Sequence, residues 1–291
     1  MNARTLSDSF ASAVRTASAA VVRVDGRRRH PSSGLIWAPG VVVTAAHTLE
    51  REDDLAVGLP DGRTVPATLV GVDAGTDLAV LRVADGADGA DWRFADPPDA
   101  GHLVLAVGRP GRIRVAVSVI TGRGDAWQSR GGAAVDAWVE TELGPWPGFS
   151  GSAALDADGA LLGLNTAVFG RRSVVIPVAT VRRVVTDLLA HGRVPKAWLG
   201  IGTHPVRLGA GLAALAGQPG ALLIDAVAPG SPAEAAGLLL GDALVQFDGA
   251  GVTGVDALLA RLGADQVGKS IPVRLVRAGA LVDVPITVGS R

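Results

Sequence analysis

The sequence contains no cysteine. This absence excludes disulfide bonds, cysteine-ligated zinc sites and thiol nucleophiles, but it says nothing about the compartment, because a chain without thiols is indifferent to redox state. An excess of charge of one sign is also missing, since 27 lysines and arginines face 28 aspartates and glutamates, for a formal net charge of −1. Without a basic excess there is no electrostatic reason to expect a nucleic-acid partner.

Long uninterrupted apolar runs are absent as well. The longest uncharged segments, 31–49 and 208–224, are broken by prolines and glycines, so neither fits a membrane-spanning helix of about 20 apolar residues. Asp8, Arg15 and Arg23 interrupt the N-terminal segment, which is unlike a signal peptide. We therefore expect no membrane span and, for the chain as it stands, a cytoplasmic location. A precursor whose export segment had been trimmed would look the same, which leaves a periplasmic or exported location open.

No metal or cofactor site is predicted. The histidines are scattered, without an i, i+4 pair or a carboxylate at ligand spacing. Residues 263–270 match the phosphate-loop pattern G-x-x-x-x-G-K-[ST], but that motif needs a strand before it and a helix after it. Here a helix is expected before and a strand after, with Pro272 two residues beyond, so we set nucleotide binding aside.

The chain has 291 residues, of which 48% are hydrophobic, which is enough for two domains that each bury a core. Apolar spacing predicts a helix over 5–19. From 20 to 176, short β-like runs alternate with Asp-Gly and Pro-Gly turns, which is typical of antiparallel sandwiches or barrels, and the segment is long enough for two small barrels. A helix over 177–190 and a linker at 193–196 follow. A smaller unit then occupies 197–291. Strands are predicted there over 198–201, 221–227, 243–247, 272–276 and 281–288, with one short helix after the Ser231-Pro232 cap and another helix over 255–262.

Three chemically capable side chains stand at strand ends in the β-rich part: His47, Asp77 and Ser150. A serine hydroxyl needs a neighbouring base to act as a nucleophile, and the imidazole needs a carboxylate on its other nitrogen. In the tight turn Pro-Gly-Phe-Ser-Gly-Ser, the amides of Gly148 and Ser150 could stabilise an oxyanion. Each pattern alone is more often structural, but the order His–Asp–Ser within a two-barrel pattern is much more specific.

These segments resemble the HtrA/Deg family of trypsin-fold serine proteases. The resemblance rests on Thr-Ala-Ala-His47, on Thr-Asp77-Leu-Ala-Val and on the turn around Ser150, and it covers about 17–192. It implies a mainly β fold, with a trypsin-like double β-barrel in 1–192 after an N-terminal helical segment. It also implies catalysis by the three residues, ATP-independent cleavage of unfolded or damaged proteins, and a homotrimer.

The unit at 197–291 resembles a PDZ domain of the kind that these proteases carry. The run Pro-Gly-Ser-Pro-Ala at 229–233 and the pair Gly241-Asp242 match that domain. Its first loop would capture the terminal carboxylate of a peptide with successive amides, and the next strand would add the peptide as an extra strand. The residues implied in peptide binding are Trp198, Leu199, Gly200, Ile201, Leu258 and Leu262. The two leucines could equally be ordinary core residues.

Several positions depart from the family pattern around the nucleophile. Phe149 replaces an asparagine, Ser152 a glycine, Glu142 an aspartate and Arg109 an asparagine. These changes concern the oxyanion loop rather than the three catalytic side chains. They keep open a second hypothesis, a catalytically dormant PDZ-containing scaffold or chaperone that binds peptides. The loop 169–173 stands where the family builds a pocket for small or medium apolar residues.

Overall fold

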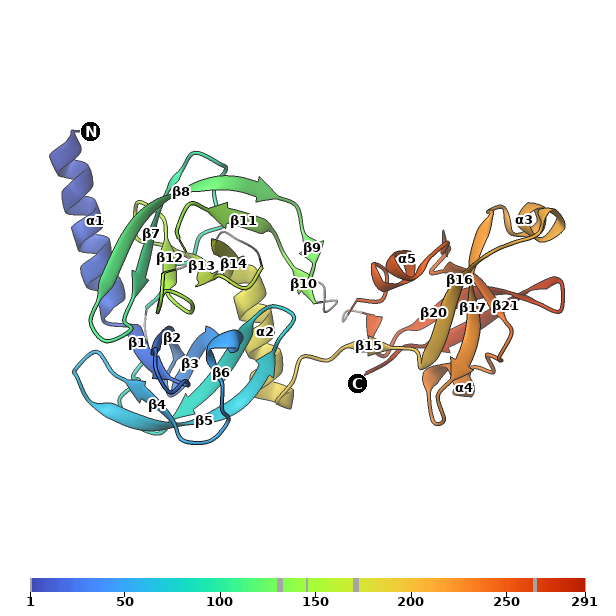
Figure 1. The fold of residues 1–291 in the computed structure, drawn as a ribbon, viewed down its shortest axis with the longest axis horizontal. Coiled ribbons are helices and arrows are strands. Elements are labelled where there is room, and N and C mark those ends of the chain that lie inside the picture. Colours follow the sequence, from blue (N-terminus) through green and yellow to red (C-terminus); the bar gives the residue numbers. More distant parts are fainter. Residues whose placement is uncertain are drawn as a thin grey trace. The chain divides into compact units, whose positions relative to one another are not determined.

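The computed structural model describes residues 2–89, 91–129, 133–144, 146–169, 173–263 and 266–290. The chain divides into two compact units, Met1–Val194 and Pro195–Arg291, and each is described by itself. The first contains two closed six-stranded barrels, and the second a sheet with short helices (Figure 1). The predicted fold class, a trypsin-like double barrel followed by a PDZ domain, is confirmed.

The first barrel closes in the strand order β1-β2-β3-β6-β5-β4, and every neighbouring pair is antiparallel. Valines and leucines alternate inward along these strands and fill the interior, which is the pattern expected of a small barrel. The strands are β1 (Val21–Asp25), β2 (Ser32–Ala38), β3 (Val41–Ala45), β4 (Leu55–Gly58), β5 (Thr64–Asp73) and β6 (Leu78–Val83). A single 3-10 turn, η1 (Ala46–Thr48), follows β3 and carries His47.

The second barrel closes in the order β11-β14-β13-β12-β7-β8. A separate two-stranded ribbon of β9 and β10 stands between β8 and β11 in the sequence. The strands are β7 (Leu103–Gly108), β8 (Arg114–Gly124), β9 (Trp127–Gln128), β10 (Ala134–Val135), β11 (Trp138–Thr141), β12 (Ala153–Leu155), β13 (Leu161–Thr166) and β14 (Ser173–Pro177). The turn that carries Ser150 thus lies between β11 and β12.

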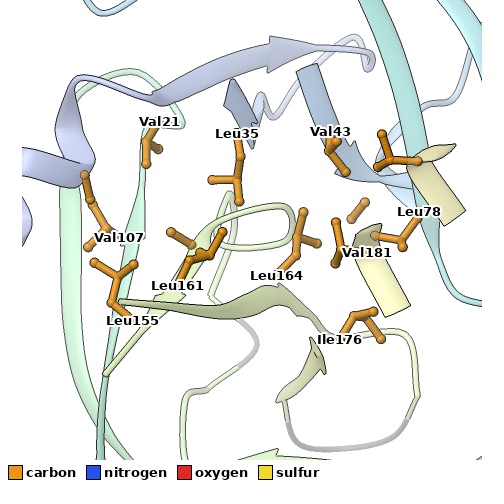
Figure 2. Close-up of a cluster of buried hydrophobic side chains, with 14 of the residues drawn as sticks. Val21, Leu35, Val43, Leu78, Val107, Leu155, Leu161, Leu164, Ile176 and Val181 are labelled. Atoms are coloured by element: carbon orange, nitrogen blue, oxygen red, sulfur yellow. The ribbon is translucent and has the colours of Figure 1, made fainter. Parts of the chain in front are cut away.

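One apolar core joins the two barrels (Figure 2). The α2 helix (Val178–His191) closes it, and this helix ends at Gly192, whose φ of 70° is left-handed and therefore suits glycine. The α1 helix (Ala3–Ser18) buries Ala13 and Ala17 against the same core. The labelled side chains are Val21, Leu35, Val43 and Leu78 from the first barrel, Val107, Leu155, Leu161, Leu164 and Ile176 from the second, and Val181 from α2.

The second unit is a sheet in the order β16-β17-β18-β20-β21, with β19 paired to β18 and a separate pair of β15 and β22. Ser231 caps α4 by accepting a hydrogen bond from Glu234 N, as the Ser-Pro pair predicts. The elements are β15 (Ala197–Trp198), β16 (Ile201–Arg207), α3 (Ala210–Ala216), β17 (Gly220–Val227), α4 (Pro232–Ala235), β18 (Ala243–Phe247), β19 (Ala250–Gly251), α5 (Val255–Leu259), β20 (Ser270–Arg277), β21 (Ala280–Thr287) and β22 (Gly289–Ser290).

Some sequence predictions for this unit are wrong. The strand predicted over 198–201 is interrupted, because Gly200 has a φ of 81° and its added Cβ would lie 2.2 Å from Ser231 Cβ. The helix predicted over 255–262 ends at Leu259, and α3 has no counterpart in the prediction. Ser270, the last residue of the phosphate-loop pattern, begins a strand. In the described part of the chain, no helix combines the length and apolar character that crossing a membrane requires.

Candidate active site

His47 and Asp77 form a close pair at the end of the first barrel. The Nδ1 atom of His47 lies 2.7 Å from Oδ2 of Asp77, and the backbone N–H of His47 donates to Oδ1 at 2.8 Å. The carboxylate is buried, whereas the imidazole side chain is 30% exposed. The two contacts fix the ring orientation and occupy Nδ1, so that Nε2 is the nitrogen available to a substrate or nucleophile.

The carboxylate of Asp77 is itself held from several sides. Its backbone has a φ of 59°, a left-handed conformation that aspartate tolerates better than most residues. The preceding turn is fixed by Asp73, which accepts hydrogen bonds from Thr76 Oγ1 at 2.7 Å and Gly75 N at 3.2 Å. The hydroxyl of Thr166 donates to Oδ2 of Asp77. Asp77 is therefore a preorganised hydrogen-bond acceptor, whose own position depends on both barrels.

The turn around Ser150 requires its two glycines. Gly148 has a φ of 89°, and a Cβ there would lie 2.3 Å from Pro110 Cβ. Gly151 has a φ of 84°, and a Cβ there would lie 1.9 Å from the carbonyl oxygen of Ser33. Because both the backbone conformation and the space exclude a side chain, the motif Gly-x-Ser-Gly follows from local geometry.

The β2 strand holds the nucleophile turn and the histidine turn at the same time. Ser33 N donates to Ser150 O at 3.2 Å, and Ser33 Oγ donates to Gly148 O at 2.7 Å. One residue earlier, Ser32 Oγ donates to Thr48 Oγ1 at 2.9 Å, directly after His47. Two neighbouring residues of the first barrel thus set the position of Ser150 relative to the imidazole.

The β13 strand makes a second connection from the other barrel. Asn165 donates from Nδ2 to Ser152 Oγ at 3.0 Å, and its carbonyl accepts from Gly151 N at 2.9 Å. The next residue, Thr166, is the one that donates to Asp77. Sequence analysis assigns no role to Asn165, Thr166 or Ser33. The run 163–168 resembles a strand of the family beside the substrate, but the partners of these residues lie far away along the chain and no local pattern reveals them.

Ser150 is half-buried, and its hydroxyl makes no hydrogen bond to His47 Nε2 within the described residues. In the same part of the chain, the Ser150 hydroxyl and His47 Nε2 also have no other side-chain or backbone partner. The structure brings the predicted residues His47, Asp77 and Ser150 to the same junction between the barrels through β2 and β13. Apo sites often lack the hydrogen bond between nucleophile and base, which forms in the complex with substrate.

The two amides expected to form an oxyanion hole lack a hydrogen-bond acceptor within the part of the chain that the structure describes. Among the residues that the structure describes, neither Gly148 N nor Ser150 N donates a hydrogen bond. The neighbouring amides are occupied, since Phe149 N donates to Trp146 O at 3.2 Å and Ser152 N to Phe149 O at 3.0 Å. Two unpaired donors on either side of Phe149 match what a developing oxyanion needs.

The departures from the family pattern have structural roles here. Phe149 is 3% exposed and packs with Ala106 and Leu143, and Trp146 meets its ring edge-on at 6.0 Å. The turn is therefore fixed by apolar burial where an asparagine would use hydrogen bonds. Ser152 is fully buried and satisfied by Asn165, so it too is built into the turn.

Arg109 links the site to the N-terminal helix. Its guanidinium donates to Ser18 O and Val21 O, both at 2.7 Å, and its backbone N–H donates to Ser33 Oγ at 2.8 Å. Burial lowers the pKa of this guanidinium from its ordinary value. An arginine so placed satisfies the last carbonyl of α1 and the first carbonyl of β1, and it reaches the Gly148 turn through Ser33.

Aromatic side chains pack beside the loop where the resemblance puts the substrate pocket. Trp127 lies edge-on to Phe169 at 5.3 Å and to Trp138 at 5.1 Å. Residues 170–172 of the predicted pocket loop 169–173 lie outside the described residues. The described start of the loop is thus held by the β9 ribbon through ring contacts.

The second unit presents its own pair of unpaired amides. Leu199 N and Gly200 N have no acceptor among the described residues, although Leu199 is only 3% exposed. Their carbonyls accept from Ala233 N and Ala228 N, which fixes the loop. Leu258, 5% exposed, belongs to the core, with Leu262 packed against that core beyond the end of α5.

Within the described ranges, no group of three or more metal-ligating side chains comes together.

Comparison with known proteins finds a different family match in each of the two units. Residues 32–164 match the family described as Trypsin-like peptidase domain, and residues 198–288 match PDZ domain. A probable periplasmic serine endoprotease, DegP-like, from Chlamydia muridarum is 31% identical over 266 residues, 87% of this chain and 52% of the relative. The DegP-like protein from Halomonas elongata is 31% identical over 271 residues, 90% of this chain and 57% of that one. The chain spans about half the length of these relatives.

Solved structures match over nearly the whole chain. The HtrA-type protease AlgW with a decapeptide has a TM-score of 0.75 at 26% identity, covering 97% of this chain and 98% of that one. A serine endoprotease from Yersinia pestis has a TM-score of 0.75 at 28% identity, with 97% and 98% covered. In both cases the similarity extends over both units.

Proposed function

Since this chain belongs to the HtrA/Deg family of trypsin-fold serine proteases with a PDZ domain, we propose that it is an ATP-independent serine endopeptidase that cleaves unfolded or damaged proteins. Ser150 is the nucleophile, His47 the general base and Asp77 the residue that orients the imidazole. The observation that carries the proposal is the 2.7 Å contact of His47 Nδ1 with Asp77, at the barrel junction where the Ser150 turn is also held.

The proposed reaction is an acyl transfer in two steps. The hydroxyl of Ser150 attacks the scissile carbonyl carbon while its proton moves to His47 Nε2, and the imidazolium is stabilised by Asp77. The amides of Gly148 and Ser150 bind the oxyanion, and the imidazolium then protonates the leaving amine. Water, deprotonated by His47, hydrolyses the acyl-enzyme and releases the serine.

A serine-directed fluorophosphonate tests this proposal on the purified full chain. We expect the probe to label Ser150 and the protein to cleave casein with or without apyrase, which removes ATP. Ser150→Ala should abolish labelling and lower kcat by about 10⁶-fold. Ser12→Ala changes an exposed serine on α1 and serves as the matched control. Labelling that persists in Ser150→Ala would assign the nucleophile elsewhere.

The rival hypothesis is a dormant protease domain that serves as a peptide-binding scaffold or chaperone. The departures at Phe149, Ser152 and Glu142 motivated it, but the burial of Phe149 and the hydrogen bond to Ser152 argue that these residues support the turn. The scaffold would be favoured if neither labelling nor casein cleavage occurred even with an activating peptide present.

The PDZ unit is proposed to bind the C-terminus of a peptide. The unpaired amides of Leu199 and Gly200, with Ile201 next to them, would hold the terminal carboxylate, and Trp198 begins the loop. Leu258 and Leu262 would flank the apolar side of the groove. Binding there is proposed to deliver substrate or to regulate the protease; deletion of 197–291 should then change activation or substrate choice while labelling of Ser150 remains.

Assembly and location are proposed from the relatives. A homotrimer is the family's expected state, and light scattering of the purified chain would measure its mass. The DegP-like relatives are named as periplasmic proteins, which favours the exported alternative over the cytoplasmic one. Fractionation of the native host with an antibody against this chain tests the location directly.

A further inference from the structure

The β16 strand contains a proline where a bound peptide would pair. It forms the end of the five-strand order β16-β17-β18-β20-β21, so one side of it is unpaired in the described unit. The α5 helix lies against it, as Figure 1 shows. Under the proposed function, on which this inference rests, this free edge receives a C-terminal peptide. Pro205 stands in the middle of the strand.

The hydrogen bonds at both ends of β16 show which residues face the free edge. Gly200 O accepts from Ala228 N at 2.8 Å, and Leu208 N donates to Pro219 O at 2.9 Å. In an antiparallel ladder, backbone groups point alternately to one neighbour and to the other. The register shifts between Gly202 and Thr203, but the extra residue, Asp225, lies on β17, so the alternation along β16 is kept. Even-numbered positions from 200 to 208 therefore bond to β17, and the backbone groups of odd-numbered positions point outward.

The outward residues are Ile201, Thr203, Pro205 and Arg207. With its carboxylate on the amides of Leu199 and Gly200, a peptide running antiparallel to β16 would pair its third-from-last residue with Thr203. Its fifth-from-last residue would then meet Pro205, which has no N–H to donate.

We propose that the groove recognises only the last four residues of a captured C-terminus, because Pro205 removes the donor that the fifth residue's carbonyl needs. The preferred partner is then a short free C-terminus, and residues upstream of the fourth add little affinity. A proline on an edge strand also limits sheet-to-sheet aggregation. That role concerns contacts between whole chains and predicts no dependence of affinity on peptide length.

The test uses the full chain carrying Ser150→Ala, so that peptides are bound without being cleaved. Fluorescein-labelled Ser-Gly-Ser-Gly-Ser-Thr-Val-Val and its N-terminal truncations to six, five and four residues are titrated by fluorescence anisotropy. We expect Kd values within a factor of about 2 from four to eight residues. In a chain that also carries Pro205→Ala, the six- and eight-residue peptides should bind about 2- to 12-fold tighter, the effect of one hydrogen bond.

The four-residue peptide should bind the Pro205→Ala chain as it binds the parent. Pro285→Ala is the matched control, since Pro285 is an exposed proline on β21, the opposite edge of the sheet. Affinity that rises steadily with length in the parent chain would overturn the inference. A Pro205→Ala chain whose affinity does not depend on peptide length would also overturn the inference. If the Pro205→Ala chain self-associates, Pro205→Lys takes its place, because lysine restores the same N–H while its charge opposes edge-to-edge pairing.

Failure of the proposed function has a different signature. If no peptide binds, or if the C-terminally amidated octapeptide binds as well as the free acid, then carboxylate capture is overturned and the length limit with it. If the free acid binds and the amide does not, the groove stands, and the length series alone judges Pro205.

Discussion

The hydroxyl of Ser33 donates to the carbonyl of Gly148 at 2.7 Å, across the junction between the two barrels. The same hydroxyl accepts from Arg109 N at 2.8 Å, so it serves two segments at once. Ser33 is fully buried. A buried hydroxyl with both a donor and an acceptor partner fixes the turn before Ser150 more firmly than either contact would alone.

Ser33→Ala should loosen this turn. The Gly148 carbonyl and the Arg109 amide would lose their partner, which costs about 1–3 kcal/mol for each unsatisfied buried group. We expect kcat for a quenched peptide substrate to fall by about tenfold, together with the rate constant of fluorophosphonate labelling. Ser12→Ala again provides the control. An unchanged labelling rate would mean that the turn keeps its geometry without this hydroxyl.

Thr166→Val should weaken the hold on Asp77 with little change in side-chain volume. A hydrogen bond to a charged group contributes about 1.5–3 kcal/mol, which corresponds to roughly 10- to 100-fold in rate if it acts in the transition state. The expected result is a lower kcat with an unchanged KM. Thr166→Ser keeps the hydroxyl and should restore most of the rate. Equal activity of the valine and serine variants would contradict the assignment.

Arg109→Ala should release the end of α1. Without the guanidinium, the carbonyls of Ser18 and Val21 lose a donor, so amides over residues 3–18 should exchange faster in hydrogen–deuterium exchange. Arg112→Ala changes an exposed arginine of the same turn and should leave this exchange unaltered. Identical protection in both variants would show that α1 is held by its apolar face alone.

The contact between Asp242 and Arg277 leads us to predict that the stability of the second unit depends on pH. Burial raises the pKa of Asp242, but hydrogen bonds from Arg277 and from Leu239 N outweigh it and hold the pKa below its ordinary value. The carboxylate's contribution to stability is therefore complete above its unfolded pKa of about 3.9 and is lost as the pH falls through the lower folded value. Removing the guanidinium should accordingly matter at neutral pH and much less in acid.

Arg277→Gln should lower the free energy of unfolding of the second unit by about 1.5–3 kcal/mol at pH 7. Hydrogen exchange of β18 and β20 in increasing urea measures it, and the difference from the parent should shrink as the pH falls below the unfolded pKa of about 3.9. Arg274→Gln removes another arginine of β20, which pairs with Asp283 on β21 at the exposed surface, and it should cost much less because solvent screens that pair. Equal losses in the two variants would contradict the role of burial.

Local sequence patterns identify the fold and the three candidate catalytic residues because turns and strands carry local marks. His47, Asp77 and Ser150 each stand in a motif of a few residues. The roles of the residues that align them carry no such local mark, since Thr166 meets Asp77 across 89 positions and Ser33 meets Gly148 across 115. Only the closed barrels bring these partners together.

Other features escape prediction for a different reason. The break at Leu199 and Gly200 arises because Gly200 packs on Ser231, a tertiary contact that overrides the apolar pattern of Trp-Leu-Gly-Ile. The α3 helix has seven residues and none is fully buried, since only Leu212 and Ala216 pack in part against the sheet, which is too short a pattern to mark a helix. The burial of Phe149 likewise depends on Leu143 and Ala106, which meet it only in the folded barrel.

Hydrogen bonds from both barrels hold the Ser150 turn, from β2 on one side and from β13 on the other. A slight parting of the halves would separate the nucleophile from its base while each barrel kept its own strands. On warming, the cleavage rate should therefore fall several degrees below the temperature at which circular dichroism detects melting. Enzyme activity would then report heat damage earlier than the loss of secondary structure does.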